Sequence, residues 1–273
     1  MRIAFITDTH FGPRAYHEGK LRKLAEHASG LTREFVQTMN DVERPNWVVN
    51  LGDVIEDQNP NDDARHYAEF LEILAGLNAP ILHVAGNHDQ VNLPPDTLGK
   101  LWSQPGALHY TRDLGTLRAL VLRTDHTDTA VHLETAQIEW LRVALERSPL
   151  PCLVLVHHPL CEMDVSDNVW FKNQPNICRV AERRRVRDIL EASGKVVAVF
   201  NGHVHWNYLS VIRGIGYVTL QSLIENVEED APGRPAGAYA VADFEQNRVS
   251  VRVAGAEPAH YRLDSGASFS NPR

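Results

Sequence analysis

The sequence predicts an α/β fold with mostly parallel sheets covered by helices. Over the first two hundred residues, five short apolar runs bounded by Gly, Pro or Asn have the composition of buried strands, and helical periodicities lie between several of them. Such alternation of strand and helix is typical of parallel sheets packed under helices. After residue 205, short strand-like runs follow one another through turn-rich links, which predicts an antiparallel β-rich part.

Each of the five predicted strands is followed directly by polar residues. The strands span residues 2–6, 47–51, 81–84, 153–156 and 196–200. The motifs that follow them are Asp8-Thr9-His10, Gly52-Asp53, Gly86-Asn87-His88-Asp89, His157-His158-Pro159 and Gly202-His203-Val204-His205. Because ligands collect outside the carboxyl ends of strands in open α/β sheets, we expect the five ends to converge on one site.

Apolar residues at helical spacing predict four helices. One pattern runs from Leu21 to Phe35 and another from Tyr67 to Leu77. Asn59 and Pro60 predict the start of the second helix, as a capping residue and a first-turn proline. Two further helices are expected near 133–147 and 177–193.

We expect one domain over residues 1–273, with a β-rich C-terminal part at 206–260 and a tail at 261–273 that frays. The predicted strands of the β-rich part span 209–212, 216–220, 238–241 and 249–253. The segment from Glu228 to Gly237 is rich in proline and acid, which predicts an exposed loop.

The composition is ordinary for a globular protein, with 43% hydrophobic and 23% charged residues. No run approaches the roughly 18 apolar residues of a membrane span, and the apolar N-terminal stretch is shorter than a secretory core. Cys152, Cys161 and Cys178 match no zinc pattern, which favours plain thiols and a cytoplasmic protein. The formal charge of -8 argues against binding to duplex nucleic acid.

The motifs contain seven potential metal ligands, Asp8, His10, Asp53, Asn87, His157, His203 and His205. Any one of the motifs alone is usually a turn or a hydrogen-bonded histidine, but five in order predict a metal centre. If strand geometry continued, residues two apart would share a face, so Asp8 would chelate with His10, and the rings of His203 and His205 would point to the same side.

The tetrapeptide that ends in Asp89 adds a group beyond the ligands. Asn87 offers a neutral amide oxygen to a metal, and His88 is suited to donate to a phosphoryl oxygen. We therefore predict Asn87 and His88 as substrate-binding residues and His88 as the catalytic one. Asp89 is expected to fix the tautomer of His88.

The ordered set of motifs resembles the calcineurin-like metallophosphoesterase superfamily over residues 1 to about 210. Its Gly-Asn-His-Asp and Gly-His-Val-His forms are most similar to bacterial class III cyclic nucleotide phosphodiesterases and glycerophosphodiesterases. The resemblance implies a four-layer α/β/β/α sandwich of two mixed sheets flanked by helices. The superfamily often has His-His-Pro-Pro where this chain ends in Leu160, a position that holds no metal.

The resemblance also implies the two metal sites. It assigns Asp8, His10, Asp53 and His205 to the first metal, and Asp53, Asn87, His157 and His203 to the second. Asp53 is then the bridge, and His88 binds the phosphoryl oxygen without ligating a metal. Mixed nitrogen and oxygen ligands suit Mn, Fe or Zn, and two such ions activate a bridging water for in-line displacement without a protein nucleophile.

The predicted function is hydrolysis of a small phosphodiester, first a 3′,5′- or 2′,3′-cyclic nucleotide and next a glycerophosphodiester. A phosphomonoesterase and a nucleotide pyrophosphatase are the enzymatic alternatives, because the ligands do not separate them. A non-catalytic scaffold is the third reading, although it predicts missing ligands and none is missing.

The sequence does not decide the role of two segments. The loop of residues 161–174, after Pro159, is expected to be a lid or an interface loop. Its Trp170 and Phe171 are expected to stack on a nucleobase, to pack internally or to contact a second copy of the chain. A homodimer could use this loop or the β-rich tail. The arginine run within 182–188 predicts a solvated helix face, with attraction of phosphate as the alternative.

Overall fold

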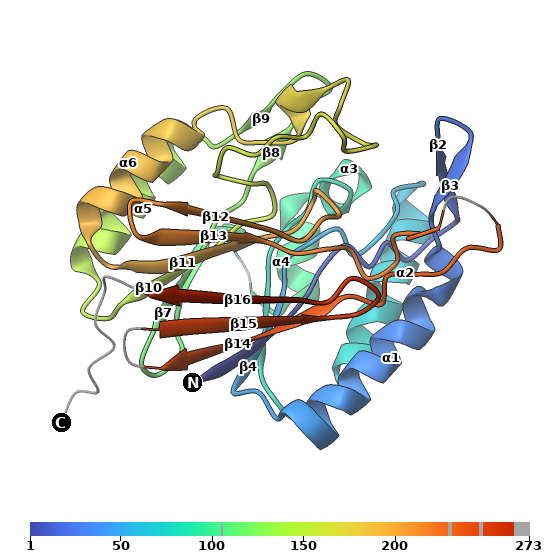
Figure 1. The fold of residues 1–273 in the computed structure, drawn as a ribbon, viewed down its shortest axis with the longest axis horizontal. Coiled ribbons are helices and arrows are strands. Elements are labelled where there is room, and N and C mark those ends of the chain that lie inside the picture. Colours follow the sequence, from blue (N-terminus) through green and yellow to red (C-terminus); the bar gives the residue numbers. More distant parts are fainter. Residues whose placement is uncertain (105, 229–230, 246–247, 265–273) are drawn as a thin grey trace.

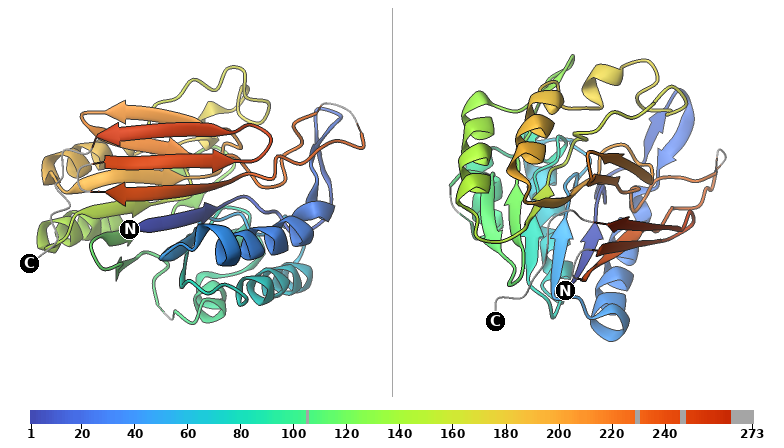
Figure 2. Two further views of the ribbon diagram at one scale, coloured as in Figure 1. Left: turned by 60° about the horizontal axis from the view of Figure 1, so that its bottom comes forward. Right: turned by 60° about the vertical axis from the view of Figure 1, so that its left-hand side comes forward.

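The computed structural model describes residues 1–104, 106–228, 231–245 and 248–264. Two six-stranded mixed sheets lie face to face, and helices cover the outer side of each sheet (Figures 1 and 2). The predicted four-layer α/β/β/α sandwich is therefore confirmed. None of the helices in the described ranges is long and apolar enough to cross a membrane.

The first sheet has the strand order β16-β15-β14-β1-β4-β5. Strands β1, β4 and β5 are parallel, whereas the three C-terminal strands are antiparallel to their neighbours. Their bounds are Arg2–Ile6 for β1, Trp47–Asn50 for β4, Ile81–His83 for β5, Tyr239–Glu245 for β14, Arg248–Ala254 for β15 and Ala259–Asp264 for β16. The last strand extends into the segment expected to fray, and residues 265–273 lie outside the described ranges.

The second sheet has the order β12-β13-β11-β10-β7-β6. Its bounds are Tyr110–Asp113 for β6, Arg118–Val121 for β7, Cys152–Leu155 for β10, Val196–Asn201 for β11, Tyr208–Ile212 for β12 and Ile215–Thr219 for β13. The β-rich part is not wholly antiparallel as predicted, because β13 runs parallel to β11 while β12 turns back along its outer edge.

Three apolar clusters correspond to the three interfaces between the four layers. Within β1, Ile3 and Phe5 point between the sheets, while Ala4 and Ile6 point to the helices on the outside, as the two-residue period of a strand requires. Phe5 stacks on Phe200 of β11 with ring centroids 4.2 Å apart. Both faces of the central strands are thus buried, which explains their continuous apolar sequence.

The helices of the first outer layer are α1 (Ala28–Thr38), α2 (Pro60–Leu74), α3 (Asp89–Asn92) and α4 (Pro95–Leu101). Those of the second are α5 (Thr135–Arg147) and α6 (Arg183–Ser193). The predicted cap of α2 is confirmed, since the Asn59 side chain accepts from the backbone N–H groups of Asn61 and Asp62 at 3.1 Å each.

Two helix predictions were wrong at their N-terminal ends. The pattern from Leu21 begins in strand β3 (Lys20–Lys23) and a 3₁₀ turn, η1 (Ala25–His27), before α1 starts. The fourth helix begins at Arg183, because the short turn η3 (Pro175–Ile177) precedes it. In both places, apolar residues at helical spacing are buried by tertiary contacts of short strands and turns, so the spacing did not mark a continuous helix.

The remaining short elements were not predicted. Strands β2 (Ala15–His17) and β3 form a hairpin, β8 (Asp125–His126) pairs with β9 (Val131–His132), and the π-helical turn η2 (Met39–Glu43) extends α1. The predicted exposed loop is only partly exposed, because Ala236 is buried while Glu228 and Arg234 are exposed; residues 229–230 lie outside the described ranges.

Candidate metal centre

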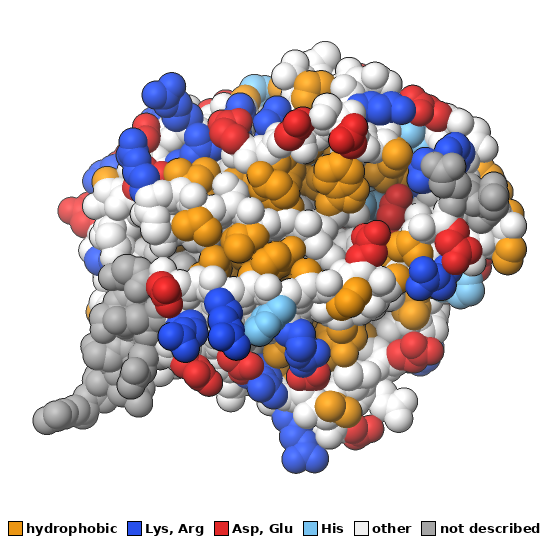
Figure 3. Space-filling model, in the orientation of Figure 1, with side chains coloured by type: hydrophobic (Ala, Val, Ile, Leu, Met, Phe, Trp, Pro, Cys, Tyr) orange, Lys and Arg blue, Asp and Glu red, His pale blue; other side chains and the backbone are white. Residues whose placement is uncertain are grey.

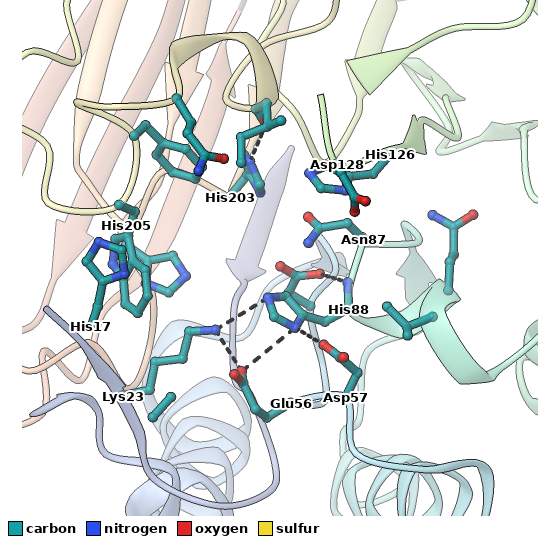
Figure 4. Close-up of a pocket in the computed structure, with 18 of the residues that line it drawn as sticks. His17, Lys23, Glu56, Asp57, Asn87, His88, His126, Asp128, His203 and His205 are labelled. Atoms are coloured by element: carbon teal, nitrogen blue, oxygen red, sulfur yellow. Dashed lines mark hydrogen bonds and ion pairs between the residues drawn. The ribbon is translucent and has the colours of Figure 1, made fainter. Parts of the chain in front are cut away.

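All seven predicted ligands lie just beyond the ends of β1, β4, β5, β10 and β11, as the strand pattern predicts. Asn87 is partly buried and the other six are buried. A pocket of about 720 Å³ opens over them, and Asp53, Asn87, His88, His203 and His205 line it (Figure 4). Residues separated by almost two hundred positions in the chain therefore meet at one place.

The ligands fall into adjoining groups. Asp8, His10 and His205 form one, in which Asp8 Oδ1 lies 3.3 Å from His205 Nε2 and 3.9 Å from His10 Nε2. Asp8, Asp53 and His157 form the next, with His157 Nε2 3.1 Å from Asp53 Oδ2, and His157 also groups with His203 and His158. Asp53 thus stands between the two ends of the site, where the predicted bridge belongs.

Strand geometry does not continue through the motifs. Asp8, His10, Asp53, His203 and His205 all have positive φ, between 42° and 70°. Non-glycine residues rarely adopt this conformation, and it is concentrated at functional sites. The expectation that His203 and His205 share a face was consequently wrong, since their rings join different groups.

Two glycines permit the close approach of the motifs. A Cβ on Gly86 would lie 2.1 Å from Asp53 Oδ1, and a Cβ on Gly202 would lie 2.1 Å from Thr7 Oγ1 and 2.4 Å from Asp8 Oδ2. No side chain fits in either place, so these glycines let two strand ends pack directly against a carboxylate.

Each of the four ligand histidines has one ring nitrogen held by an acceptor outside the site. The nitrogen–acceptor pairs are His10 Nδ1 with Glu56 Oε2 at 2.9 Å, His157 Nδ1 with the Leu51 carbonyl at 2.9 Å, His203 Nε2 with the Ile177 carbonyl at 3.1 Å and His205 Nδ1 with Glu225 Oε2 at 2.6 Å. Such partners fix the tautomer of metal-binding histidines and leave the other nitrogen free to ligate.

The remaining ring nitrogens point into the site. His10 Nε2 and His205 Nε2 lie 3.2 Å apart, and His10 Nε2 is an acceptor when its Nδ1 donates to Glu56. Among the described residues, the buried Asn87 Oδ1 makes no hydrogen bond, and His157 Nε2 lies 3.1 Å from Asp53 Oδ2 without hydrogen-bond geometry. Buried polar atoms are rarely left so, and a cation satisfies them. The donor set of carboxylate, amide oxygen and imidazole therefore fits two first-row metal ions.

A family model for calcineurin-like phosphoesterases matches residues 1–207. The chain belongs to this family. It is 26% identical over 83% of its length to 79% of the glycerophosphodiester phosphodiesterase GpdQ of Enterobacter lignolyticus, and 24% identical over 93% to 92% of a probable cyclic nucleotide phosphodiesterase of a Pseudoalteromonas species. A dimetal phosphatase from Danio rerio has the same fold, with a TM-score of 0.78 and 18% identity over 97% of this chain and 98% of that one.

Members of the family use a dinuclear metal centre, and this phosphoesterase is accordingly a hydrolase of phosphoric esters. The ligand role of each individual residue stays a prediction, supported by the geometry above.

The charges around the phosphoesterase site divide its histidines into two kinds. Burial lowers the pKa of His10 to about 4, assisted by the nearby Lys23 ammonium, and burial with His157 nearby lowers that of His203. Against the effect of burial, Asp53 raises the pKa of His157 to about 9, and Asp8 with Glu225 does the same for His205. In the metal-free protein, the last two therefore hold protons that a metal must displace.

The carboxylates respond in the opposite direction. Burial alone raises the pKa of Asp8, but the imidazole of His205 holds it well below its usual range. His157 and His88 similarly outweigh burial and lower the pKa of Asp53. Both carboxylates are thus ionised and able to bind a cation at neutral pH.

His88 has a different partner from the one predicted. Its Nδ1 contacts the carboxylate of Asp57, and its Nε2 lies 3.4 Å from Lys23 Nζ at the pocket (Figure 4). Asp89 does not fix its tautomer. That carboxylate instead accepts from the backbone N–H groups of Asp53, Val54 and Gly86 at 2.8 to 3.0 Å. Asp89 is the first residue of α3, beside the Asp53 turn, and from there its side chain reaches these amides rather than the ring of His88.

Several residues at the site were not predicted from the sequence. Glu56, Asp57 and Glu225 accept from site histidines, and Lys23 Nζ bonds to Glu56 Oε2 at 2.7 Å. His158 is buried, with its Nδ1 2.7 Å from Thr124 Oγ1. Glu56 and Asp57 follow the Gly-Asp motif closely, which was a usable signal, whereas Lys23 and Glu225 lie in segments without a motif.

Proposed function

We propose that this phosphoesterase hydrolyses a small phosphodiester, most specifically a 3′,5′- or 2′,3′-cyclic nucleotide, with two Mn, Fe or Zn ions bound by the seven predicted ligands. The observation that carries the proposal is the convergence of buried carboxylates and imidazoles beside His88, among which Asn87 Oδ1 and His157 Nε2 make no hydrogen bond. The phosphodiesterase names of two relatives support the same reaction class.

The charge of the pocket favours a diester over a monoester. Among the described residues that line it, Lys23 and Arg123 are the only lysine or arginine side chains. Lys23 pairs with Glu56 at 2.7 Å and Arg123 with Asp125 at 2.5 Å, while Asp57 and Asp128 add further acid. Beyond the metals, these described residues thus offer a monoester no unpaired cation for its second negative charge, whereas a diester carries only one.

Another part of the pocket wall is aromatic. Trp170 and Phe171 line the pocket together with Tyr16 and His17, and Tyr16 is 62% exposed. Flat side chains stack on nucleobases without strong sequence preference. This wall therefore supports the choice of a cyclic nucleotide over a glycerophosphodiester, whose alcohols have no ring to stack.

The metals, when bound, supply the Lewis acidity that activates water and neutralises the phosphoryl oxygens. The chain supplies the remaining steps. Asp57 orients the ring of His88 through Nδ1, so that Nε2 faces the pocket. As an imidazolium whose charge Asp57 balances, the ring would stabilise the developing phosphoryl charge, or give its Nε2 proton to the leaving oxygen and regain one from water. The backbone N–H of His88 also donates to Asp53 Oδ1 at 2.9 Å, which fixes the acid relative to the predicted bridging carboxylate.

The test is the ratio of kcat/KM for bis(p-nitrophenyl) phosphate to that for p-nitrophenyl phosphate, with manganese-reconstituted protein and a chelated control. We expect a ratio well above one, followed by turnover of a cyclic nucleotide in a panel of 3′,5′- and 2′,3′-cyclic substrates. A ratio well below one would contradict the proposal and identify a phosphomonoesterase instead. Turnover of neither substrate points to a pyrophosphatase or a scaffold.

We also propose a cytoplasmic protein in one domain, whose partner is its small substrate rather than duplex nucleic acid or a membrane. The three buried free thiols support that compartment. Hydrophobic side chains gather on one face of the molecule (Figure 3). For a homodimer we propose the edge strand β12, which carries the exposed Val211 and the partly buried Tyr208, Leu209 and Ile212. Sedimentation of wild type and Val211→Asp tests this contact, and a monomeric wild type excludes it.

A further inference from the structure

The segment 161–178 forms part of the pocket wall and contacts both histidines of the Gly202–His205 motif. We propose that Trp170 and Glu225 are positioning residues for His205, through which segment 161–178 sets the affinity of the site for metal. The inference rests on the proposed metal centre, but it concerns a connection outside the ligand set.

Glu225 joins the indole of Trp170 to the ring of His205. Trp170 Nε1 donates to both oxygens of the Glu225 carboxylate at 3.3 Å each, and Glu225 Oε2 accepts from His205 Nδ1 at 2.6 Å. Glu225 is 7% exposed, so little water competes for these bonds. The indole N–H thereby helps to hold the carboxylate where it accepts from His205 Nδ1, while His205 Nε2 lies 3.3 Å from Asp8 Oδ1.

The same segment is fastened to the motif at two more points. The Asn168 side chain donates to the carbonyl of Val204 at 3.0 Å and accepts from the backbone N–H of Trp170 at 3.0 Å. Farther along, the Ile177 carbonyl accepts from His203 Nε2 at 3.1 Å. Both rings that flank Val204 therefore depend on this one segment for their orientation.

Trp170 also connects the segment to the β2–β3 hairpin. Its ring lies 4.9 Å from that of His17, and Lys23 Nζ is 5.2 Å from its centroid, while Lys172 pairs with Glu18 at 2.7 Å. The affinity for metal and the position of the aromatic wall are then thermodynamically linked, and such linkage is reciprocal. Binding of metal to His203 and His205 stabilises segment 161–178, and a change that destabilises this segment lowers the affinity for metal.

The first experiment compares two Trp→Phe variants by equilibrium dialysis with manganese. Trp170→Phe keeps an aromatic ring but removes the N–H donor. Trp102→Phe is the matched control, because Trp102 Nε1 donates to Tyr67 Oη at 3.0 Å in the layer of α2 and α4. We expect Trp170→Phe to lose about 10-fold in affinity, the lower end of what outer partners of ligands contribute, and Trp102→Phe to lose none.

A second pair of variants tests Glu225 itself. Glu225→Gln keeps an acceptor for His205 and is expected to bind metal better than Glu225→Ala, with a shifted Co²⁺ absorption spectrum only in Glu225→Ala. Hydrogen exchange over 161–178 should slow on metal binding in wild type and less so in Trp170→Phe. Should either Glu225 variant unfold, Trp170→Phe and its exchange pattern still decide the matter.

Wild-type affinity and wild-type exchange in Trp170→Phe would overturn the inference, and Trp170 would then be only a wall of the pocket. These readouts do not depend on any substrate. If wild type itself binds no metal, the proposed function fails as well, so the two failures are distinguishable.

Discussion

The two sheets contribute unlike halves of the site. The first sheet supplies Asp8, Asp53 and Asn87, all oxygen donors, together with His10, whereas the second supplies only histidines, His157, His203 and His205. The halves are also held differently. The buried Asp89 accepts from backbone amides of the Asp53 turn, while segment 161–178 contacts the Gly202–His205 motif through the Asn168 side chain and the Ile177 carbonyl.

This difference explains how the fold combines oxygen and nitrogen ligands, and how, in our proposal, a segment outside the ligand set influences the affinity for metal. Short carboxylates need close backbone approach, and the first half gives it at Gly86, where no Cβ fits. Imidazoles reach farther and need a partner on the outer nitrogen, which a loop can provide. We therefore expect loss of the Asp89 contacts in the first half to destabilise the protein, and changes in segment 161–178 to weaken metal binding.

The largest effect is expected from Asp53→Asn, which removes the predicted bridge. One of the two Asp53 oxygens and the negative charge are lost, so hydrolysis of the diester should fall to the level of chelated wild-type protein. Steady-state assays over a range of manganese concentrations measure this. Recovery of the full rate at high manganese would show that Asp53 is an ordinary ligand rather than the bridge.

His88→Ala separates the proton donor from the metals. We expect the rate to fall by about 10² to 10⁴, the range of general acid catalysis, with the metal content unchanged because His88 is not one of the predicted ligands. Elemental analysis alongside kcat checks both halves of the expectation. Asp57→Asn should lower kcat in the same direction but less, and full activity in His88→Ala would refute its role.

Asp89→Ala should destabilise the metal-free protein. It leaves the buried N–H groups of Asp53, Val54 and Gly86 without their acceptor, and one such orphaned group costs about 1–3 kcal/mol. Urea denaturation measures the loss, with Asp89→Asn as the milder control because its carbonyl still accepts. Trp170→Phe should leave this stability nearly unchanged, and equal losses in both variants would remove the contrast between the halves.

The smallest expected effect is the pH dependence of stability that His83 causes, in the layer between the first sheet and its helices. Burial lowers the pKa of His83 to about 4, whereas an unfolded histidine titrates near 6.5. Between these values the unfolded state binds one more proton, so His83 makes stability rise with pH across this window and is without effect above it. The shift corresponds to about 3 kcal/mol at most.

His83→Phe removes that titration and keeps the stack on Trp102, whose ring centroid is 5.4 Å away. Thermal melts of the metal-free protein from pH 4 to 7 should show a shallower loss toward acid in the variant. An exposed His27→Asn variant serves as the control. Identical pH profiles for wild type and His83→Phe would mean that the buried ring is not the cause.

The sequence alone predicted the five strands that lead into the site, because buried strands need apolar residues on both faces, and it predicted that their ends meet. It did not predict the left-handed turns at Asp8 and His203, since the two-residue spacing indicated continued strand. Nor did it predict Lys23 or Glu225, which reach the site through tertiary packing of segments that carry no motif. The early start predicted for the first helix failed for the same reason.

The most direct test of the two-sheet metal centre is the number of ions bound per chain. We would reconstitute the metal-free protein with manganese, dialyse it and measure metal against protein by elemental analysis. We expect two manganese ions per wild-type chain and a loss of tight manganese binding in Asp53→Ala. One ion or none in wild type, or two ions retained in Asp53→Ala, would contradict it.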